Sequence, residues 1–307
     1  MKSILDDNLA DCKCCPRRCG VNRLKGEAGF CGIGFKSLVA HTGLHFGEEP
    51  PISGVNGSGT IFFAGCNLKC VFCQNFQISQ EFSTIKTAAM STDELADEML
   101  TLQKKGAHNI NFVSPSHVIF QMAEAVIKAK KQGLTIPVVY NSNGYDSVDA
   151  LREIRGIVDI YMPDLKYMDN ELGLKFSMVD DYADIVPGVL SEMSAQTGFL
   201  KINKTGIAQK GLLVRHLVLP GFLENSKKCL SLIADLSKDT FVSLMSQYSP
   251  QYKAAEYNGI NRVLTKQEYE EITEFALDLG LENVFVQDIS SRDNFLPDFD
   301  RADPFRI

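Results

Sequence analysis

The sequence lacks a surplus of basic residues and lacks long apolar runs. Its 38 Asp and Glu residues outnumber its 31 Lys and Arg residues, and the formal net charge is −7. Nucleic acids and anionic membranes bind clustered basic side chains, whereas the basic residues here are scattered, so neither is expected as a partner. No apolar stretch approaches the ~18 residues of a membrane span, and residues 1–15 contain no apolar signal core. We therefore expect a cytoplasmic protein.

Internal repeats and low-complexity tracts are also absent. With 307 residues, of which 45% are apolar, the chain is long enough for one large domain with a full core and a small appendage. Cysteine is unevenly distributed, because eight of the nine cysteines fall within the first 73 residues and only Cys229 stands apart. Thiols in a reducing compartment are more often ligands than disulfide partners, so we interpret the eight as ligand candidates and Cys229 as a packing residue.

Beyond the cysteine-rich start, short apolar runs alternate with helical patterns. The runs predict strands at residues 59–65, 109–114, 136–142, 158–164, 211–221 and 239–248, with a seventh at 283–288. The helical patterns lie at residues 91–107, 117–132, 146–154, 225–237 and 265–280. The first helix opens with Ser91 as N-cap and Glu94 three residues later, the pattern of a capping box.

Strands that alternate with helices predict a parallel sheet. Six such units fit either a doubly wound sheet or an incomplete (β/α) barrel, and periodicity does not choose between them. The glycine-rich residues 48–60 have the composition of a linker. We expect a cysteine-rich extension and linker at residues 1–56 and a β/α domain at residues 57–307. Glu48 and Glu49 are interpreted as linker charges, and His41 and His45 as ordinary strand or turn residues.

Polar side chains follow the predicted strands at their carboxyl ends, which form the working surface in both architectures. Asn141 and Ser142 end the third strand, Asp164 and Lys166 follow the fourth, and Arg215 lies within the apolar run of the fifth. Helix caps and turns use the same residue types, so each polar residue alone is a weak signal. Arg215 is stronger, because a charge in a buried strand needs an anionic partner.

Three cysteines form the densest motif. The loop "GCNLKCVFCQN" (residues 65–75) follows the first predicted strand and spaces Cys66, Cys70 and Cys73 as C-x3-C-x2-C. Four thiolates close the coordination of a [4Fe-4S] cube, whereas three leave one iron open to another molecule. Structural zinc normally takes four protein ligands, and no further His or Cys follows at the usual spacing, so the motif favours an open iron–sulfur cluster.

This motif resembles that of the radical S-adenosylmethionine (SAM) superfamily, in which the amino and carboxylate groups of SAM chelate the open iron. The resemblance covers about residues 57–290 and implies a partial (β/α)6 TIM-like barrel, an α/β fold open on one side, here with a small cysteine-rich N-terminal extension. The chain is most similar to the pyruvate formate-lyase activating enzymes and their uncharacterised relatives with a cysteine-rich N-terminus. The similar stretches are "GSGTIFFAGCNLKCVFCQN", "NSNGY", "YMPDLKYMD" and "VRHLVLPG".

The resemblance implies roles for individual residues. Phe72 matches the position whose ring packs near adenine, Lys166 lies in the matching D-L-K, and Arg215 matches an arginine near the active site that would pair with the SAM carboxylate. The positions that hold a monovalent cation beside SAM are matched by Asn141, Ser142, Met162 and Asp164. One departure is the Gly-Gly-Glu stretch that receives the methionine amino group: residues 113–117 read Val-Ser-Pro-Ser-His instead, so serine hydroxyls or carbonyls would have to substitute.

The implied reaction is reductive cleavage of SAM to methionine and a 5′-deoxyadenosyl radical, which abstracts a hydrogen atom from a substrate. The implied partner is a low-potential electron donor of the flavodoxin or ferredoxin type. In the activating enzymes the target is a backbone glycine of a partner glycyl-radical enzyme, whereas this sequence leaves open a protein or a small-molecule substrate. The alternative is a non-catalytic iron–sulfur protein for electron transfer or assembly, but the polar residues around an open iron favour an enzyme.

A second group of cysteines lies in the N-terminal extension. Cys12, Cys15, Cys19 and Cys31 are spaced C-x2-C-x3-C-x11-C, with Cys14 beside them. Four thiols so close together predict a closed metal site, which either zinc or a second iron–sulfur cluster fits. Disulfides are the alternative, which the expected cytoplasmic setting disfavours.

Overall fold

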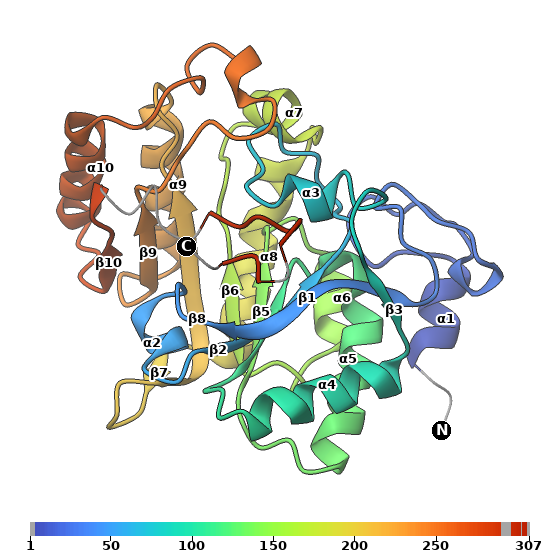
Figure 1. Cartoon of the computed structure of the whole chain (residues 1–307). Helices are drawn as coiled ribbons and strands as arrows, with labels where there is room; N and C mark the ends of the chain where they lie inside the picture. The colour runs from blue at the N-terminus through green and yellow to red at the C-terminus, as the bar shows by residue number, and fades with distance from the viewer. Residues whose placement is uncertain (1–3, 290–295, 302, 306–307) are drawn as a thin grey trace.

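The computed structural model describes residues 4–289, 296–301 and 303–305. Within these residues one sheet of ten strands has the order β10-β9-β8-β6-β5-β4-β2-β1-β3, and the short β7 (Lys201–Ile202) pairs with β8 (Figure 1). Seven neighbouring strands are parallel: β2 (Ser58–Phe63), β4 (Ile110–Val113), β5 (Val138–Ser142), β6 (Ile160–Pro163), β8 (Ala208–Leu217), β9 (Phe241–Met245) and β10 (Val284–Val286).

The predicted α/β fold is confirmed. The parallel strands β2 to β9 are the six that the sequence predicts, and they form a partial barrel whose open edge is extended by β10, the predicted seventh strand. Five helices also lie where they are predicted: α4 (Thr92–Lys104), α5 (Ile119–Lys131), α6 (Val148–Glu153), α9 (Leu223–Leu236) and α10 (Lys266–Asp278). Ser91 and Glu94 form the predicted capping box at the start of α4.

Two helices between β6 and β8 were not predicted, α7 (Asn170–Ser177) and α8 (Tyr182–Thr197). Buried residues of α8 recur at helical spacing, but Pro187 lies inside the helix, where it removes a hydrogen-bond donor. The remaining short helices are α1 (Ile4–Ala10), α2 (Pro50–Ser53), α3 (Phe76–Ser79) and the 3₁₀ turns η1 (Arg23–Lys25), η2 (Ser116–Val118) and η3 (Ala254–Glu256). No helix of the described residues is both long and apolar enough to cross a bilayer.

An antiparallel strand, β1 (Ser37–His45), joins the N-terminal part of the chain to the sheet. It pairs with β2 on one side and with β3 (Ala88–Met90) on the other. His41 and His45 lie on this strand, which agrees with their interpretation as ordinary strand or turn residues. The chain then turns through α2, which places Ile52 in an apolar cluster with Val139, Ile160 and Leu213. Because Val139 and Ile160 lie at the starts of β5 and β6, α2 closes that end of the barrel interior.

The C-terminal residues 296–301 and 303–305 lie across the front of the barrel (Figure 1). The rings of Phe299 and Phe305 pack on Phe62, which belongs to β2, at 5.5 and 5.3 Å between centroids. The backbone N–H of Phe299 donates to Gln77 Oε1 of α3 at 2.9 Å. This segment therefore covers part of the opening between β1 and α3.

Candidate active site

A cavity of about 540 Å³ lies inside the barrel and reaches the carboxyl ends of the parallel strands. Nine of the predicted site residues line it: Cys66, Cys70, Cys73, Phe72, Asn141, Ser142, Asp164, Lys166 and Arg215. Of the residues predicted for the [4Fe-4S] cluster and SAM, the exception is Met162, which is fully buried in an apolar cluster with Ile52 and Val139. The volume is within the range of about 300–1,000 Å³ that is usual for small-molecule and cofactor sites.

The cysteine loop is held tightly where it leaves β2. Gly65 has φ +75°, and a Cβ at this position would lie 2.5 Å from the carbonyl oxygen of Cys31, so glycine is required both by conformation and by space. Further along, the backbone N–H groups of Lys69 and Val71 donate to Ser177 O and Phe176 O of α7 at 3.1 and 2.9 Å. These contacts fix the loop between the N-terminal extension and α7.

Each thiol of the loop has a polar neighbour. Asn143 Nδ2 donates to Cys66 Sγ at 3.4 Å, Ser177 Oγ lies 3.0 Å from Cys70 Sγ, and Ser79 Oγ lies 3.3 Å from Cys73 Sγ. Burial raises the pKa of both Cys66 and Cys70 to about 11 and also raises the pKa of Cys73. Binding of metal by these thiols would therefore release protons, and the donors are placed to hydrogen-bond the resulting sulfur ligands.

Phe72 is held in place by aromatic neighbours. Its ring meets Tyr248 and Phe176 edge to face, at 6.0 and 6.4 Å between centroids. Tyr248 in turn donates its hydroxyl to Ile260 O at 2.5 Å. The Phe72 ring is therefore held in one position where it lines the cavity, next to the cysteine loop.

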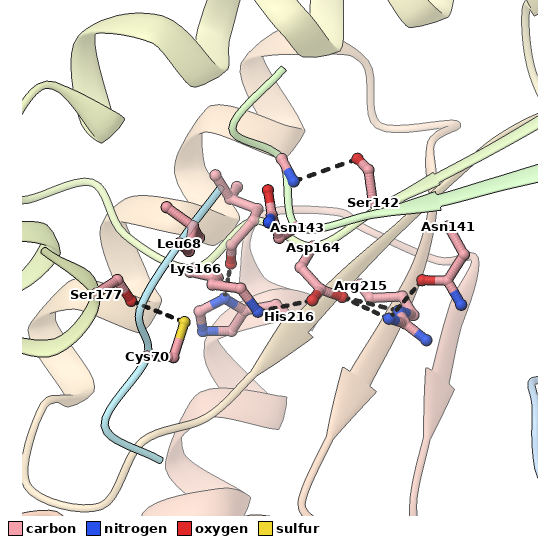
Figure 2. Close-up of polar contacts among 12 residues, drawn as sticks. Leu68, Cys70, Asn141, Ser142, Asn143, Asp164, Lys166, Ser177, Arg215 and His216 are labelled. Atoms are coloured by element: carbon pink, nitrogen blue, oxygen red, sulfur yellow. Dashed lines mark hydrogen bonds and ion pairs between the residues drawn. The ribbon is translucent and has the colours of Figure 1, made fainter. Parts of the chain in front are cut away.

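Asp164 is the centre of the polar network at the strand ends, as Figure 2 shows. Lys166 Nζ donates to Asp164 Oδ2 at 2.7 Å, and Arg215 Nε donates to Oδ1 at 2.8 Å. Arg215 also donates to Asn141 Oδ1 at 2.8 Å. Burial acts to raise the pKa of Asp164, but the two cations outweigh it and hold that pKa below its usual value. The anionic partner that the sequence predicts for Arg215 is therefore Asp164.

Glu48 and Glu49 are not solvated linker charges, and that interpretation is wrong. The Glu48 side chain is 9% exposed, lies 3.4 Å from Arg215 Nη1 and accepts from Asn111 Nδ2 at 3.0 Å. Glu49 is buried, and both residues line the cavity. Burial raises the pKa of each carboxyl group. The turn from β1 into α2 carries these two residues into the barrel, which local sequence composition does not reveal.

Other polar residues at the strand ends hold the framework. His216 bridges Leu165 O and Ser226 Oγ at 2.7 and 2.9 Å, and burial lowers its pKa to about 4, so it is neutral at pH 7. Ser142 donates to Asp146 Oδ2 at 2.6 Å. Ser114 lines the cavity and has φ +58°, the left-handed region that glycine favours. This is the first serine of the stretch that replaces Gly-Gly-Glu.

Comparison with known proteins identifies the family. The radical SAM superfamily model matches residues 60–226. An uncharacterized protein of Methanocaldococcus jannaschii is 36% identical over 282 residues, which is 90% of this chain and 77% of that protein. The chain belongs to the radical SAM superfamily.

Two solved structures share the radical SAM fold of this chain. One is HydG, a maturase of the [FeFe]-hydrogenase, with a TM-score of 0.53 at 8% identity over 74% of this chain and 50% of HydG. The other is Streptococcus suis SuiB bound to its precursor peptide SuiA, with a TM-score of 0.50 at 13% identity over 74% of this chain and 48% of SuiB. The chain spans about half the length of each, and at these identities the similarity shows the fold alone.

Membership of the radical SAM superfamily implies a [4Fe-4S] cluster and SAM as cofactors. The cavity fits both groups chemically. Three thiols that share one cavity match a cluster with an open iron. The Phe72 ring and the ion pairs around Asp164 suit a ligand that has both an adenine ring and charged groups.

The cysteines of the N-terminal extension line a second, smaller pocket, together with Arg23, Asn67 and His117. The five thiols are Cys12, Cys14, Cys15, Cys19 and Cys31. Arg23 is buried, and its Nη1 lies 3.6 Å from Cys14 Sγ and 3.9 Å from Cys12 Sγ. No three His, Cys, Asp or Glu side chains in the described part of the chain are grouped as around a single metal ion.

Proposed function

We propose that this chain binds a [4Fe-4S] cluster through Cys66, Cys70 and Cys73, binds SAM in the adjoining cavity, and abstracts a hydrogen atom from a substrate held in the barrel. The observation that carries the proposal is that the C-x3-C-x2-C thiols share one cavity with Phe72 and with the network around Asp164. When bound, the cluster supplies the electron that cleaves SAM into methionine and a 5′-deoxyadenosyl radical.

The protein's own part is binding, orientation and exclusion of water. In this proposal the Phe72 ring, held by Tyr248 and Phe176, packs against adenine. Arg215 and Lys166 place positive charge where the SAM carboxylate would lie. Ser114, already in a left-handed conformation at the end of β4, receives the methionine amino group in place of Gly-Gly-Glu.

The resemblance also implies a monovalent cation at Asn141, Ser142, Met162 and Asp164, and we include it in the proposal although Met162 lies outside the cavity. Both oxygens of Asp164 are already paired, with Lys166 and with Arg215. A cation at Asp164 would therefore have to displace one of the two. Asp164→Asn tests this role, because a bound cation predicts weaker SAM binding together with a smaller difference between potassium and sodium buffers.

The subtype that we propose is a glycyl-radical-activating-like enzyme, reduced by a donor of the flavodoxin or ferredoxin type. In this proposal the substrate is a backbone glycine of a partner enzyme. The sequence leaves a small-molecule substrate open as the second possibility. The test is to incubate the protein with SAM, a reductant and a candidate partner, and to look for a glycine-centred radical by electron paramagnetic resonance.

The enzymatic role itself is tested without a substrate. The anaerobically reconstituted full chain is incubated with SAM and dithionite, and 5′-deoxyadenosine is measured. We expect about four irons per Cys66-Cys70-Cys73 site and formation of 5′-deoxyadenosine. A cluster that is reduced by dithionite but leaves SAM intact would favour a non-catalytic iron–sulfur protein.

We also propose that residues 1–56 form a metal-binding extension to the barrel domain of residues 57–307. Its ligands are Cys12, Cys15, Cys19 and Cys31, with zinc or a second cluster as the metal. The pocket that these thiols line supports this proposal, as does the buried Arg23 beside them, since it needs anionic neighbours. A Cys66/Cys70/Cys73→Ala variant should keep bound metal, and elemental analysis of that variant identifies it.

A further inference from the structure

The charged groups that line the cavity are not balanced. Among the lining residues that the structure describes, three carboxyl groups, on Glu48, Glu49 and Asp164, face two permanent cations, on Lys166 and Arg215. Both cations contact Asp164, and Arg215 also lies 3.4 Å from Glu48. Arg215 is shared among Asp164, Glu48 and Glu49, so the three carboxylates together carry one negative charge more than the two cations offset.

Glu49 has only part of the hydrogen bonding that a buried carboxylate usually has, although the Ser243 side chain bonds to it. Its Oε2 is buried and has no hydrogen-bond partner among the described residues. Glu49 is the N-cap residue of α2, yet its side chain makes no capping hydrogen bond. The residue as a whole is 9% exposed and lines the cavity. Burial of an ionised carboxylate with one oxygen left unbonded is costly, so this position calls for a positively charged ligand or a bound proton.

The cofactors do not supply the missing charge. Three thiolates and an oxidised [4Fe-4S] cube together carry one negative charge, and SAM carries one positive charge, so the two offset each other. The imbalance at Glu49 therefore persists when both are bound. Glu49 interacts with Ser243 of β9 and with Arg215 of β8, and the described residues show no interaction between it and the three thiols of the cysteine loop. The part of the barrel around Glu49 is therefore left for a substrate.

We infer that Glu49, with Glu48 beside it, binds an ammonium or guanidinium group of the substrate. This inference rests on the proposed function and specifies its substrate class. The cationic group belongs either to a free amine or to a Lys or Arg side chain next to a target glycine. A backbone glycine alone carries no charge and would leave the excess negative charge of the cavity uncompensated.

The test uses the anaerobically reconstituted full chain with SAM bound. Pentylamine and pentylguanidine are titrated by calorimetry, and 1-pentanol is the neutral probe of the same chain length. A tripeptide that contains Lys-Gly represents a cationic group carried by a peptide. We expect the cationic probes to bind, and Glu49→Gln to weaken them by about 10- to 150-fold, the effect of losing a charge-assisted hydrogen bond. Asp97→Asn removes the same charge from the exposed face of α4 and should change nothing.

Thermal unfolding provides a second readout. Because Glu49→Gln removes the excess negative charge of the buried cluster, it should raise the melting temperature of the ligand-free protein while it weakens amine binding. A lower melting temperature with unchanged amine binding would make Glu49 a structural partner of Arg215 and would overturn the inference. So would equal binding of pentanol and pentylamine, or displacement of the amine by potassium at constant ionic strength. Tighter binding of the free amine than of the tripeptide assigns the cation to a small molecule, and the reverse assigns it to a peptide.

The same preparations separate the inference from the proposed function. Formation of 5′-deoxyadenosine without amine binding would overturn only the role of Glu49. Amine binding that depends on Glu49, without any cleavage of SAM, would overturn only the proposed function.

Discussion

At the scale of single residues, the most informative position is a charge inside a buried strand. Arg215 lies in the apolar run of β8, and elementary electrostatics predicts that it must have an anionic partner. The identity of that partner was not predictable, because Asp164 follows a different strand and Glu48 precedes the barrel. Glu48 and Glu49 were misread for the same reason, since a glycine-rich neighbourhood looks like a linker when the chain's path is unknown.

Arg215→Leu should destabilise the protein strongly. It removes the guanidinium from Asp164, Asn141 and Glu48, and breaking a buried pair by removing one partner costs about 3–5 kcal/mol. Urea unfolding measures the loss. The matched control is Arg152→Leu, because Arg152 is 59% exposed and its partner Glu192 keeps Arg155, so a change within about 1 kcal/mol is expected. Equal effects of the two substitutions would contradict the buried network.

At the scale of elements, local sequence signals located the helices and strands whose own residues carry a strong pattern. They did not locate a strand whose place depends on pairing with other segments. Capping, apolar spacing and strand composition located the six main strands and five helices. β1 was not predicted as a strand of the sheet, because its place there depends on its pairing with β2 and β3 and not on its own residues alone. A sequence that predicts parallel strands gives no local signal for an antiparallel neighbour at the edge.

The start of α10 gives a prediction about pH. Glu268 closes the capping box with Thr265, and its carboxylate also accepts from Arg262 and from the backbone N–H of Gly221, which follows β8. The bond from Arg262 is the largest of several effects that lower the pKa of Glu268 to about 2. Since an unfolded glutamate titrates near 4.3, Glu268 stabilises the fold fully above about that pH, and the contribution is lost as pH falls toward 2.

Glu268→Gln should therefore lower the free energy of unfolding at pH 7, and the difference from the parent protein should shrink at pH 3.5. Urea unfolding at both values checks this. Glu270→Gln is the control, because Glu270 forms an exposed pair with Lys266 at 3.4 Å. A Glu268→Gln effect that is the same at the two pH values would show that charge is not its cause.

At the scale of the whole molecule, the N-terminal extension and the barrel meet at the cysteine loop. The backbone of Cys31 contacts Gly65, and Arg17 Nε donates to the carbonyl oxygen of Asn67 at 3.0 Å. The sequence predicted both groups of cysteines but not that they are neighbours, because only the folded path brings residues 12–31 against residues 65–73. The C-terminal aromatic residues that cover the barrel opening were unpredicted for the same reason.

Gly65→Ala should loosen this junction. Both Gly65 and Gly106 have positive φ, but a Cβ on Gly65 would meet the Cys31 carbonyl, whereas a Cβ on Gly106 would meet nothing within 4 Å. Gly106→Ala thus reports the conformational cost alone, about 1–2 kcal/mol. Gly65→Ala should cost about 1–3 kcal/mol more, as overpacking does. If unfolding experiments gave equal losses, the extension would not pack on the loop as described.

The central claim is that the cavity works only with all three thiols of the C-x3-C-x2-C loop. The most direct measurement is 5′-deoxyadenosine formed per chain, from SAM and dithionite, by anaerobically reconstituted single variants. Cys66→Ala, Cys70→Ala and Cys73→Ala should each abolish it, because two thiolates do not anchor the cube. Cys229→Ala, which removes a buried thiol from the core, should retain it in the folded protein. Formation of 5′-deoxyadenosine at the parent's level by any of the three loop variants would contradict the account.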